Sequence, residues 1–385
     1  MNKIEELIRQ LCPEGVEYKE LGEMTKILNG YAFKSNKYTS SGIRVIRISD
    51  VQKGKMSDKD LKYYPIEMMD EIKSYILKEN DLVMSLTGNV GRVAMISERH
   101  LPAGLNQRVA CIRTKNKEIL TRFLFHFFDQ NQFEIDAMTN ATGGGQKNMS
   151  TTWLAKYMIP IPPLPVQQEI VSILDKFTQL EAELEAELEA ELEARKKQYE
   201  YYRNELLTFG DEVEYKELGN VCVFERGRTI TQKDAVEGDI PVIAGGQNPS
   251  YYHNKPNRTG ATIAVSSSGA YAGFVSFWTI PVFLSDSFSV NPQMDILLPK
   301  YVYYFLKSIQ PKIHDTKKGG GVPHVHGSSI AKFQIPIPPL PVQQEIVNIL
   351  DTFTELEAEL EAELEARKKQ YEYYREKLLS FDKAE

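Results

Sequence analysis

Leucine recurs at every fourth position in two stretches of the chain, with alanine midway between successive leucines and glutamate at the remaining positions. The longer stretch, LEAELEAELEAEL, covers Leu180–Leu192, and a shorter one, LEAELEAEL, covers Leu356–Leu364. These three residue types are strong helix formers. Prolines precede each stretch, and neither proline nor glycine follows until after Leu207 or Leu379. The pattern predicts two helices on the order of 60 Å long at ~1.5 Å per residue.

Each predicted helix begins at a proline, Pro165 or Pro341, because proline suits the first helical turn, and Gly210 is a stop signal for the first helix. A leucine spacing of four turns the apolar stripe by about 40° per step, which only a short coiled contact tolerates. Glutamates four residues apart also repel one another. The leucines therefore need a partner helix. We expect the two helices to pair antiparallel within one chain; the alternative is a coiled coil between two chains.

Short apolar runs bounded by glycine, asparagine or proline predict β-strands in the segments that lie between the long helices. One apolar helix is expected to close each segment, at 120–138 and at 298–315. Both segments are therefore expected to be α+β domains with exposed glycine-rich loops. The predicted strands lie in IRVIRISDV from residue 43, DLVMSLTG from 81, GRVAMI from 91, RVACIRT from 108, IPVIAGG from 240, ATIAVSSSG from 261 and AGFVSFW from 272.

The long helices belong to an internal repeat. IPIPPLPVQQEIVSILDKFTQLEAELEAE from Ile159 matches IPIPPLPVQQEIVNILDTFTELEAELEAE from Ile335, and EARKKQYEYYRNELL from Glu193 matches EARKKQYEYYREKLL from Glu365. The second copy is shorter by one Leu-Glu-Ala-Glu unit, called a tetrad below. Near the N-terminus, EELIRQLCPEGVEYKELG resembles RNELLTFGDEVEYKELG, which follows the first long helix. The chain thus reads as a two-fold repeat cut open at a shifted point, and we expect its termini to lie close together, with the C-terminal helix packed near the N-terminal one.

The repeat predicts an α+β architecture in which two globular domains are separated by two long antiparallel spacer helices. The two variable segments share little sequence beyond a glycine triplet, in TGGGQKN from residue 142 and KGGGVPH from residue 318. Nearly identical helices that flank dissimilar variable segments are expected of a protein that presents two different recognition surfaces. The predicted divisions are a helix tail and lead-in at 1–22, a first recognition domain at 23–158, a first spacer helix at 159–210, a second recognition domain at 211–333 and a second spacer helix at 334–385.

Charge is distributed unevenly between these parts. The 385-residue chain has 42% hydrophobic residues, which is a globular composition, and a formal net charge of −7. Thirteen glutamates lie in the tetrad stretches, and without them the remaining charge is +6. The domains are therefore mildly basic and the spacers acidic, which permits a nucleic-acid partner without establishing one.

Several loops carry side chains suited to nucleic acid. Arginine, lysine, asparagine and glutamine can read base edges, whereas serine, lysine and backbone N–H groups hold phosphates. A single glycine-rich turn of this kind is more often only a turn, but such loops occur in both domains. The candidate DNA-binding residues are Arg44, Arg47, Thr87, Asn89, Arg92, Asn106, Gln107, Arg108, Gln146, Lys147, Asn148, Arg226, Arg228, Lys233, Gln247, Asn248, Tyr251, Lys255, Ser267, Ser268, Tyr271, Lys317, Lys318, His324 and His326.

Tyrosines gather at the end of each long helix, in RKKQYEYYR. So many large amphipathic groups suit packing against a globular base or a partner protein better than a solvated helix face. The candidate subunit-interface residues are Tyr199, Tyr201, Tyr202, Tyr371, Tyr373 and Tyr374.

Sequence signatures of catalysis are lacking. NPSY at Asn248 only approaches the Asn-Pro-Pro-aromatic motif of adenine methyltransferases, and no GxxxxGK[ST] loop for nucleotide hydrolysis occurs. His324 and His326 lack a nearby third metal ligand, and we expect no metal site. Three scattered cysteines, Cys12, Cys111 and Cys222, predict neither disulfides nor zinc binding. We expect no catalytic activity and no cofactor in this chain.

At this level the chain resembles the specificity subunits of type I restriction-modification systems. The resemblance rests on the duplicated PLPVQQEI motif, on tetrads within the helix that follows, and on the RKKQYEYYR ends, and it covers the whole chain. It implies two target-recognition domains, each of which reads one half of a bipartite site in double-stranded DNA. It also implies partners: two modification subunits, which bring S-adenosylmethionine, and restriction subunits, which bring ATP- and Mg-dependent translocation and cleavage. Unlike recognition domains imply an asymmetric site.

The tetrads suggest how the gap between the half-sites is set. One tetrad adds ~6 Å and about 40° to a helix, against about 3.4 Å per base pair. Tetrad number is therefore expected to change the preferred gap by on the order of one or two base pairs if the domains stay rigid. The alternative function is a coiled-coil scaffold whose domains bind proteins; salt-sensitive, sequence-dependent DNA binding would separate the two.

No apolar run in the sequence approaches the roughly 18 residues that span a bilayer, and acidic residues interrupt the N-terminal MNKIEELIRQL where a signal peptide would be apolar. We therefore expect a cytoplasmic protein without a membrane partner.

Overall fold

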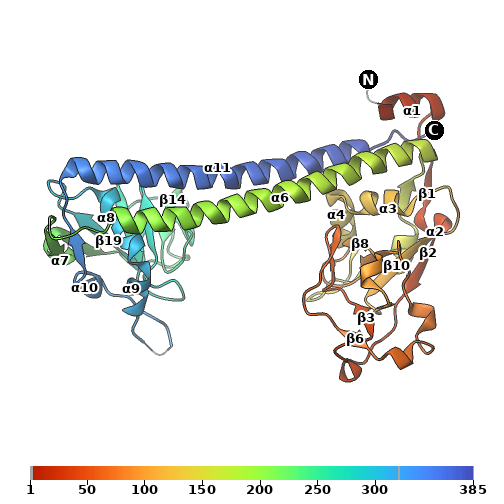
Figure 1. The fold of residues 1–385 in the computed structure, drawn as a ribbon, viewed down its shortest axis with the longest axis horizontal. Helices are drawn as coiled ribbons and strands as arrows, with labels where there is room; N and C mark the ends of the chain where they lie inside the picture. The colour runs from red at the N-terminus through yellow and green to blue at the C-terminus, as the bar shows by residue number, and fades with distance from the viewer. Residues whose placement is uncertain (1–2, 320, 385) are drawn as a thin grey trace. The chain divides into compact units, whose positions relative to one another are not determined.

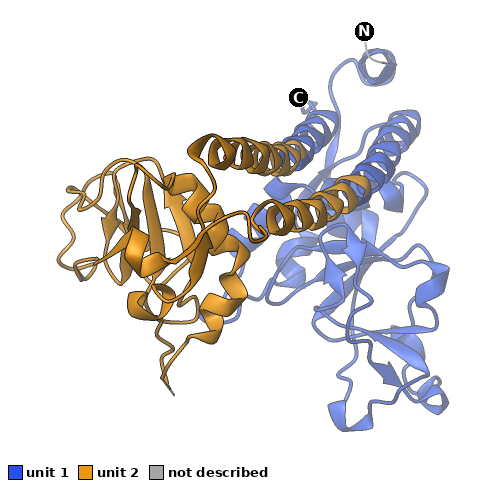
Figure 2. Ribbon diagram, turned by 60° about the vertical axis from the view of Figure 1, so that its left-hand side comes forward, with its two compact units in different colours: residues 1–186, 364–385 blue, residues 187–363 orange. Residues whose placement is uncertain are grey.

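A computed structural model describes residues 3–319 and 321–384. The chain forms two compact units (Figure 1, Figure 2). Unit 1 comprises residues 1–186 and 364–385, and unit 2 comprises residues 187–363. The two long helices, α6 (Leu164–Leu206) and α11 (Leu340–Leu378), each begin in one unit and end in the other. Both start one residue before the predicted proline.

Unit 1 holds the first α+β domain. Its helices are α1 (Lys3–Leu11), α2 (Leu21–Met24), α3 (Thr121–Phe128), α4 (Asn131–Asn140) and α5 (Thr151–Ala155), with short 3₁₀ turns at Ser35–Lys37, Ile66–Met68, Lys73–Tyr75 and Glu98–His100. Its strands are β1 (Tyr18–Glu20), β2 (Thr25–Asn29), β3 (Ile43–Ile46), β4 (Val51–Gln52), β5 (Lys55–Met56), β6 (Tyr63–Tyr64), β7 (Leu82–Ser85), β8 (Val93–Met95), β9 (Ala103–Leu105), β10 (Val109–Thr114) and β11 (Met158–Pro160).

Unit 2 holds the second α+β domain. Its helices are α7 (Leu218–Val221), α8 (Pro299–Ser308), α9 (Gln310–Asp315) and α10 (Gly327–Ile330). Its strands are β12 (Tyr215–Glu217), β13 (Cys222–Arg226), β14 (Ile240–Ile243), β15 (Tyr251–His253), β16 (Thr262–Ser266), β17 (Val275–Trp278), β18 (Phe283–Leu284), β19 (Ser287–Pro292) and β20 (Gln334–Pro336).

The two domains share one topology although their sequences differ. A four-stranded antiparallel sheet has the order β2-β10-β7-β8 in unit 1 and β13-β19-β16-β17 in unit 2. A three-stranded sheet has the order β6-β3-β9 or β15-β14-β18, with one parallel pair in each. A two-stranded pair, β1-β11 or β12-β20, joins the lead-in of each domain to the segment before the long helix. The prediction of two α+β domains built on a repeat is confirmed.

The core of unit 1 explains why its central strands are apolar throughout. Leu82 and Met84 of β7 face the core that contains α3, whereas Val83 between them faces a second core with Cys111. All of these side chains are fully buried. A strand covered on both faces needs no alternation of polar and apolar residues, and this accounts for the continuous LVM run that the sequence shows.

A buried glutamine anchors each long helix to its domain. The Gln167 side chain accepts a hydrogen bond from the backbone N–H of Leu120 (2.9 Å) and donates to the carbonyl oxygen of Glu118 (2.8 Å). In unit 2, Gln343 accepts from the N–H of Leu298 at the same distance, 2.9 Å. Both glutamines are 0% exposed. The duplicated PLPVQQEI motif therefore supplies the same clamp twice, at the residue just before the first helix of each pair (α3 or α8).

An aspartate two turns further along each long helix makes a second anchor. The Asp175 carboxylate accepts hydrogen bonds from Arg122 Nε and from His126 Nε2, both at 2.7 Å. The residues that contact the glutamine and the aspartate in unit 1 can be aligned with those that do so in unit 2. Residue 120 then aligns with residue 298, and the same numbering offset holds along α3 and α8. The equivalent contacts in unit 2 are made by Asp351, Lys300 and Tyr304.

His126 is expected to make unit 1 less stable in mild acid. Burial lowers the pKa of His126 below its ordinary value of 6.5, and its side chain is 1% exposed. The folded chain therefore keeps the imidazole neutral at a pH where the unfolded chain binds a proton. Because the folded-state pKa is depressed, the free energy of unfolding is highest above pH 6.5 and decreases as the pH falls below it.

Denaturant titrations at several pH values test this expectation. A His126→Gln variant keeps an N–H that can donate to Asp175 but cannot titrate, so its free energy of unfolding should decrease less between pH 7 and pH 5 than that of the wild-type chain. Equal slopes in the two proteins would contradict the assignment.

The long helices pair antiparallel in each unit. In unit 1 the Thr178 and Tyr371 hydroxyls lie 2.7 Å apart, and seven residues further along α6 Glu185 forms an ion pair with Lys368 at 2.7 Å. In unit 2 the ring of Tyr202 stacks on Phe353 with centroids 5.6 Å apart. The predicted pairing within one chain is confirmed within each unit. The paired segments leave only part of each leucine stripe exposed.

The chain ends meet in unit 1, as the shifted repeat predicts. The backbone N–H of Val16 donates to the carbonyl oxygen of Asp382 (2.9 Å), and Val16 pairs with Lys383 in a parallel β-bridge. Leu379 packs into the same core as Ile4 of α1. Figure 1 shows the two termini on the same side of unit 1.

The prediction of one closing helix per domain is wrong, because each of these helices is broken in two. In unit 1 the break falls after Asp129, whose carbonyl oxygen accepts a hydrogen bond from Arg375 Nη1 (2.7 Å) instead of continuing the helix. In unit 2 the break falls at Ile309, and Pro311 in the first turn of α9 has no N–H to continue α8.

Candidate nucleic-acid interface

Two loops that the sequence predicts separately form one structure in unit 1. The Thr87 hydroxyl donates to the Asn148 side-chain oxygen (2.7 Å), and the N–H of Gly88 donates to the carbonyl oxygen of Lys147 (2.9 Å). Thr142 and Asn148 pair with each other and close the glycine triplet into a hairpin. The triplet thus presents Gln146, Lys147 and Asn148 as exposed side chains beside the turn after β7.

The corresponding loops of unit 2 meet in the same way. Ser268 pairs with His324, and the N–H of Gly269 donates to the carbonyl oxygen of Pro323 (3.0 Å). Lys318 pairs with His324 across the second glycine triplet. The shared triplet, which is the one sequence feature common to both variable segments, therefore builds an equivalent hairpin in each domain.

Most predicted DNA-binding residues have solvent-exposed side chains. Three of them are buried, namely Arg44, Thr87 and Ser267. The candidates that are partly exposed are Arg47, Arg92, Asn106, Tyr251, Ser268 and Lys317. The exposed candidates are Asn89, Gln107, Arg108, Gln146, Lys147, Asn148, Arg226, Arg228, Lys233, Gln247, Asn248, Lys255, Tyr271, Lys318, His324 and His326.

Some candidates are already engaged within their own domain. Arg44 is 6% exposed, and its guanidinium donates to Asp58 (2.9 Å), so it stabilises the first domain rather than facing solvent. Arg47 forms an ion pair with Asp50 at 3.0 Å. Asp58 lies 14 residues beyond Arg44 and comes close only through the fold, so the sequence could not show this contact, whereas Asp50 is three residues from Arg47 and that pair could have been predicted.

A basic hairpin in unit 1 was missed from the sequence. Strands β4 and β5 join through a turn at Gly54, and this hairpin carries Lys53, Lys55 and, just beyond it, Lys59. These lysines line a hollow of about 1300 Å³ that the hairpin forms with the α11 side of unit 1. The run VQKGKM, with two lysines around a glycine, was the signal that could have predicted it.

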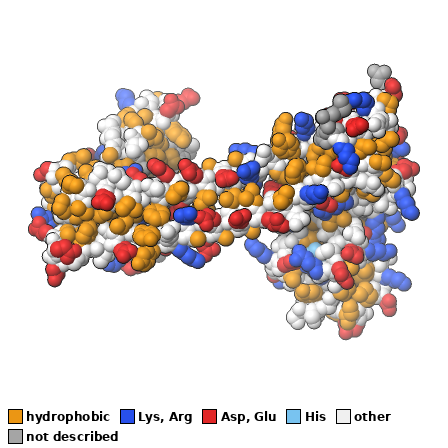
Figure 3. Space-filling view, turned by 45° about the horizontal axis from the view of Figure 1, so that its top comes forward, with side chains coloured by type: hydrophobic (Ala, Val, Ile, Leu, Met, Phe, Trp, Pro, Cys, Tyr) orange, Lys and Arg blue, Asp and Glu red, His pale blue; other side chains and the backbone are white. Residues whose placement is uncertain are grey.

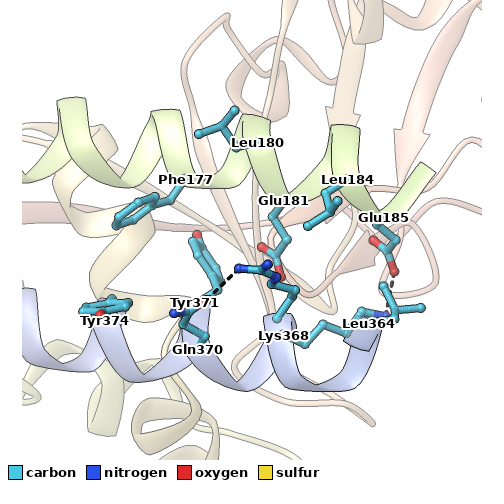
Figure 4. A pocket seen from close by; sticks show the side chains of 11 residues that line it. Phe177, Leu180, Glu181, Leu184, Glu185, Leu364, Lys368, Gln370, Tyr371 and Tyr374 are labelled. Atoms are coloured by element: carbon cyan, nitrogen blue, oxygen red, sulfur yellow. Dashed lines mark hydrogen bonds and ion pairs between the residues drawn. The ribbon is translucent and has the colours of Figure 1, made fainter. Parts of the chain in front are cut away.

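The tyrosines at the helix ends divide into exposed and covered groups. Tyr201 and Tyr373 are about 60% exposed, and Tyr202 and Tyr374 are also exposed. Tyr371 is 8% exposed. The partly buried Tyr199 packs against the core of unit 2. As Figure 4 shows for unit 1, the ring of Tyr371 points toward α6 at the edge of an apolar hollow of about 250 Å³ that Phe177 and Tyr374 also line.

The surface charge follows the predicted segregation. Figure 3 shows acidic side chains along the two long helices.

Within the described part of the chain, no cluster of three histidine, cysteine or carboxylate side chains could hold a metal ion. Over that same part, no helix combines the length and the apolar character needed to cross a membrane.

A family-wide sequence profile decides the family. The profile described as the type I restriction modification DNA specificity domain matches residues 13–194 and again residues 210–366. The chain belongs to this family. The two matches correspond to the two copies of the repeat, each with a recognition domain and the start of a long helix, and the resemblance seen in the sequence is confirmed.

Individual relatives agree with the profile. A protein of Haemophilus influenzae described as a type I restriction enzyme specificity subunit is 35% identical over 302 residues, which is 72% of this chain and 76% of the relative. The EcoR124I/EcoR124II specificity subunit of Escherichia coli is 36% identical over 273 residues, 60% of this chain and 66% of the relative. The chain is thus a type I restriction-modification specificity subunit.

The fold of this specificity subunit also matches solved structures. A chain from a structural study of complex assembly and conformational transition of the type I R-M system aligns over 95% of this chain and 97% of its own length, with a TM-score of 0.68 and 16% sequence identity. Two recognition domains with a shared topology and dissimilar loops are therefore the architecture of this family member.

Proposed function

We propose that this specificity subunit reads a bipartite, asymmetric site in double-stranded DNA, with one half-site contacted by each unit. The observation that supports this most directly is the pair of equivalent hairpins, built from the glycine triplets, that present different side chains at matching positions in the two domains: Gln146, Lys147 and Asn148 in unit 1, and Val322, Pro323 and His324 in unit 2. Equivalent position with different chemistry is what two unlike half-sites require.

The long helices are the proposed attachment points for the other subunits. Exposed Tyr201 and Tyr373 beside the ends of α6 and α11 are large amphipathic side chains of the kind that anchor protein interfaces. Two modification subunits would bind here, one for each copy of the repeat, and restriction subunits would join them. S-adenosylmethionine would be held by the modification subunits, and ATP and Mg by the restriction subunits.

This subunit itself is proposed to be non-catalytic. Its contribution is to bind DNA and to place the partner subunits on it, because the sequence holds no methyltransferase or nucleotide-hydrolysis motif. The chain's own residues then determine which adenine the modification subunit meets, and the chemistry takes place on another chain.

Methylation mapping tests the proposed function. DNA from cells that express this chain together with its modification subunit would be compared with DNA from cells that express the modification subunit alone. We expect modified adenines confined to a two-part sequence with a fixed gap, present only when this chain is expressed. Absence of sequence-dependent modification while all subunits are intact would refute the proposal.

A matched variant sharpens the test. Replacing exposed Gln146 and Lys147 of the unit 1 hairpin with alanine should relax or change the base preference in one half-site and leave the other half-site unchanged, because a lost base contact costs about 1–3 kcal/mol at its own position.

A further inference from the structure

The two units place different charges at equivalent positions close to the ends of the long helices. The glutamine clamps relate residue 120 to residue 298, and the same correspondence relates Asp129 to Lys307. The repeat of the helix ends relates Arg375 to Arg203. In unit 1 the arginine faces an acidic residue, Asp129. In unit 2 the equivalent arginine faces a lysine, Lys307, instead.

A second pair of equivalent positions lies in the turn after β7 or β16. In unit 1 the N–H of Ser85 donates to the carbonyl oxygen of Arg92 (2.9 Å), and in unit 2 the N–H of Ser266 donates to that of Phe274 (3.0 Å). These matching bonds relate Arg92 to Phe274. Gly91, which precedes Arg92, approaches Glu134 of α4, and Gly273, which precedes Phe274, approaches His314 of α9.

The charges of unit 1 are paired at these four positions. Arg375 Nη1 lies 2.8 Å from the Asp129 carboxylate, and Arg92 lies 3.6 Å from the Glu134 carboxylate. Each cation thus has its own carboxylate inside the unit, and the group has no net charge.

Two of the same four positions in unit 2 hold cations, Arg203 and Lys307, and Phe274 and His314 occupy the other two. The guanidinium of Arg203 stacks over the Tyr199 ring at 5.2 Å, and the Lys307 ammonium lies 5.1 Å from the centroid of Phe274. Neither forms an ion pair with any residue that the structure describes. The Nε atoms of Arg203 and of its counterpart Arg375 are both buried without a hydrogen-bond acceptor there, so the missing carboxylate is what distinguishes unit 2. Burial and the nearby charge of Arg203 both lower the pKa of Lys307, which is the expected effect of two cations held together.

His314 adds a hydrogen-bond donor to this group. Lys317 Nζ lies 3.3 Å from His314 Nδ1, an arrangement in which Nδ1 accepts and the proton of the neutral ring is on Nε2. Burial and the charge of Lys317 lower the pKa of His314, which favours this neutral form. Its Nε2 is buried and has no acceptor among the described side chains and backbone groups.

We propose that Arg203 and Lys307, with His314 beside Lys307, form a phosphate-binding site for the DNA backbone in unit 2 that unit 1 lacks. The inference rests on the proposed DNA-reading function. A bound anion would neutralise Arg203 in unit 2 as Asp129 neutralises Arg375 in unit 1.

A DNA phosphate fits this site better than a single carboxylate from a partner protein. Lys317 is a further cation beyond Lys307. Its ammonium lies 3.5 Å from the carbonyl oxygen of Ala270, in the turn that joins β16 to β17. Ser268 of the same turn pairs with His324 of the candidate reading hairpin. A row of positive side chains that leads to a reading loop matches a polymer that carries one negative charge per nucleotide, whereas a lone carboxylate would engage one member of the row.

The sharpest test introduces into unit 2 the ion pair that Asp129 and Arg375 form in unit 1. A Lys307→Asp substitution places a carboxylate opposite Arg203 and should leave the chain folded, because it recreates the Asp129–Arg375 pairing. Both proposed phosphate contacts are then lost at once. Binding of the full chain, assembled with its modification subunits, to a duplex that contains the mapped site and to a mixed-sequence duplex would be measured between 0.05 and 0.3 M salt.

We expect the slope of log K against log salt to become shallower by about 2 for Lys307→Asp and by about 1 for Lys307→Gln, on both duplexes alike. Affinity at 0.1 M salt should fall roughly tenfold or more for Lys307→Asp. Lys332→Gln removes an exposed lysine of unit 2 outside the group and should give a smaller change than Lys307→Gln. Circular dichroism and the unfolding midpoint verify folding, and Lys307→Arg should retain the wild-type slope.

Other results would overturn the proposal. An unchanged salt slope for Lys307→Asp would show that no phosphate binds there. An unchanged slope together with weaker binding of the modification subunit would assign the site to a partner's carboxylate instead. Failure of the wild-type assembly to bind DNA in a salt-dependent way would refute the proposed function itself, which distinguishes that failure from a failure of this site.

Discussion

Removing one tetrad from each long helix is expected to shorten the preferred gap between the two half-sites by on the order of one or two base pairs. The deletion takes ~6 Å from each helix, and a base pair occupies about 3.4 Å of duplex. Deleting from both helices preserves the antiparallel register that unit 1 fixes at Thr178–Tyr371 and unit 2 fixes at Lys196–Glu361. Affinity for the original site should fall on the order of a thousandfold, because one half-site is no longer reachable.

The measurement uses a series of duplexes in which the gap between the mapped half-sites changes by one base pair at a time. A same-length control, Glu189→Gln with Glu191→Gln, changes helix charge but not helix length and should keep the wild-type optimum. An optimum that stays at the wild-type gap after the deletion would reject the role of the tetrads as a spacer.

Replacing Arg375 with methionine is expected to destabilise unit 1 by about 1 kcal/mol at pH 7, because the folded variant can protonate Asp129, whose pKa is already raised to about 6. Arg375 is 7% exposed and Asp129 is 6% exposed. Their ion pair uses Asp129 Oδ2, and Asp129 Oδ1 has no hydrogen-bond partner among the described residues. The variant keeps an apolar side chain over the Tyr371 ring but leaves a buried carboxylate without its cation. Denaturant titration of the full chain measures the loss.

The pH dependence of this loss identifies its cause. Burial raises the pKa of Asp129 from 3.8 to about 6, although Arg375 opposes the shift. Because the folded-state pKa is raised, the stability that Asp129 contributes is complete below about pH 4 and is lost as the pH rises through 6. Without Arg375 the pKa of Asp129 rises further, so the variant should be nearly as stable as the wild type at pH 4 and about 1 kcal/mol less stable at pH 7, with the difference growing by up to ~1.4 kcal/mol per pH unit above that.

A second substitution completes the test. Asp129→Asn removes the buried charge and should restore most of the stability that Arg375→Met loses at pH 7. If Arg375→Met is as stable as the wild type at both pH 7 and pH 8, or if Asp129→Asn gives no rescue, the pair does not hold α11 to the first domain in the way described.

The elements that the sequence predicted well are those whose signal is local. Uninterrupted helix formers predicted α6 and α11, and apolar runs predicted β3, β7, β10 and β16, because a strand buried on both faces needs no long-range information to be recognised. The repeat itself predicted that the chain ends meet, which the bond between Val16 and Asp382 confirms.

Elements whose signal is not local were missed. Strand β2, TKILN, has one fully buried residue among five, so its alternation is weak. The break between α3 and α4 depends on Arg375, which lies 246 residues away in the sequence. Likewise, the sequence could select arginines suited to DNA but could not show that Arg44 is buried against Asp58. Candidate DNA-binding residues chosen by residue type thus include residues that form structural ion pairs, and only the fold distinguishes the two groups.

The glutamine and aspartate anchors have a consequence for how new specificities arise. Gln167 and Gln343 hold mainly backbone groups of their domains, and backbone groups are present whatever the local sequence. A gene segment that encodes a different recognition domain can therefore be exchanged between relatives by recombination within the repeated helix sequences. The new domain will pack in the same place if the backbone at the start of its helix equivalent to α3 or α8 bonds the same glutamine. One crossover then changes half of the recognised sequence in a single inherited event.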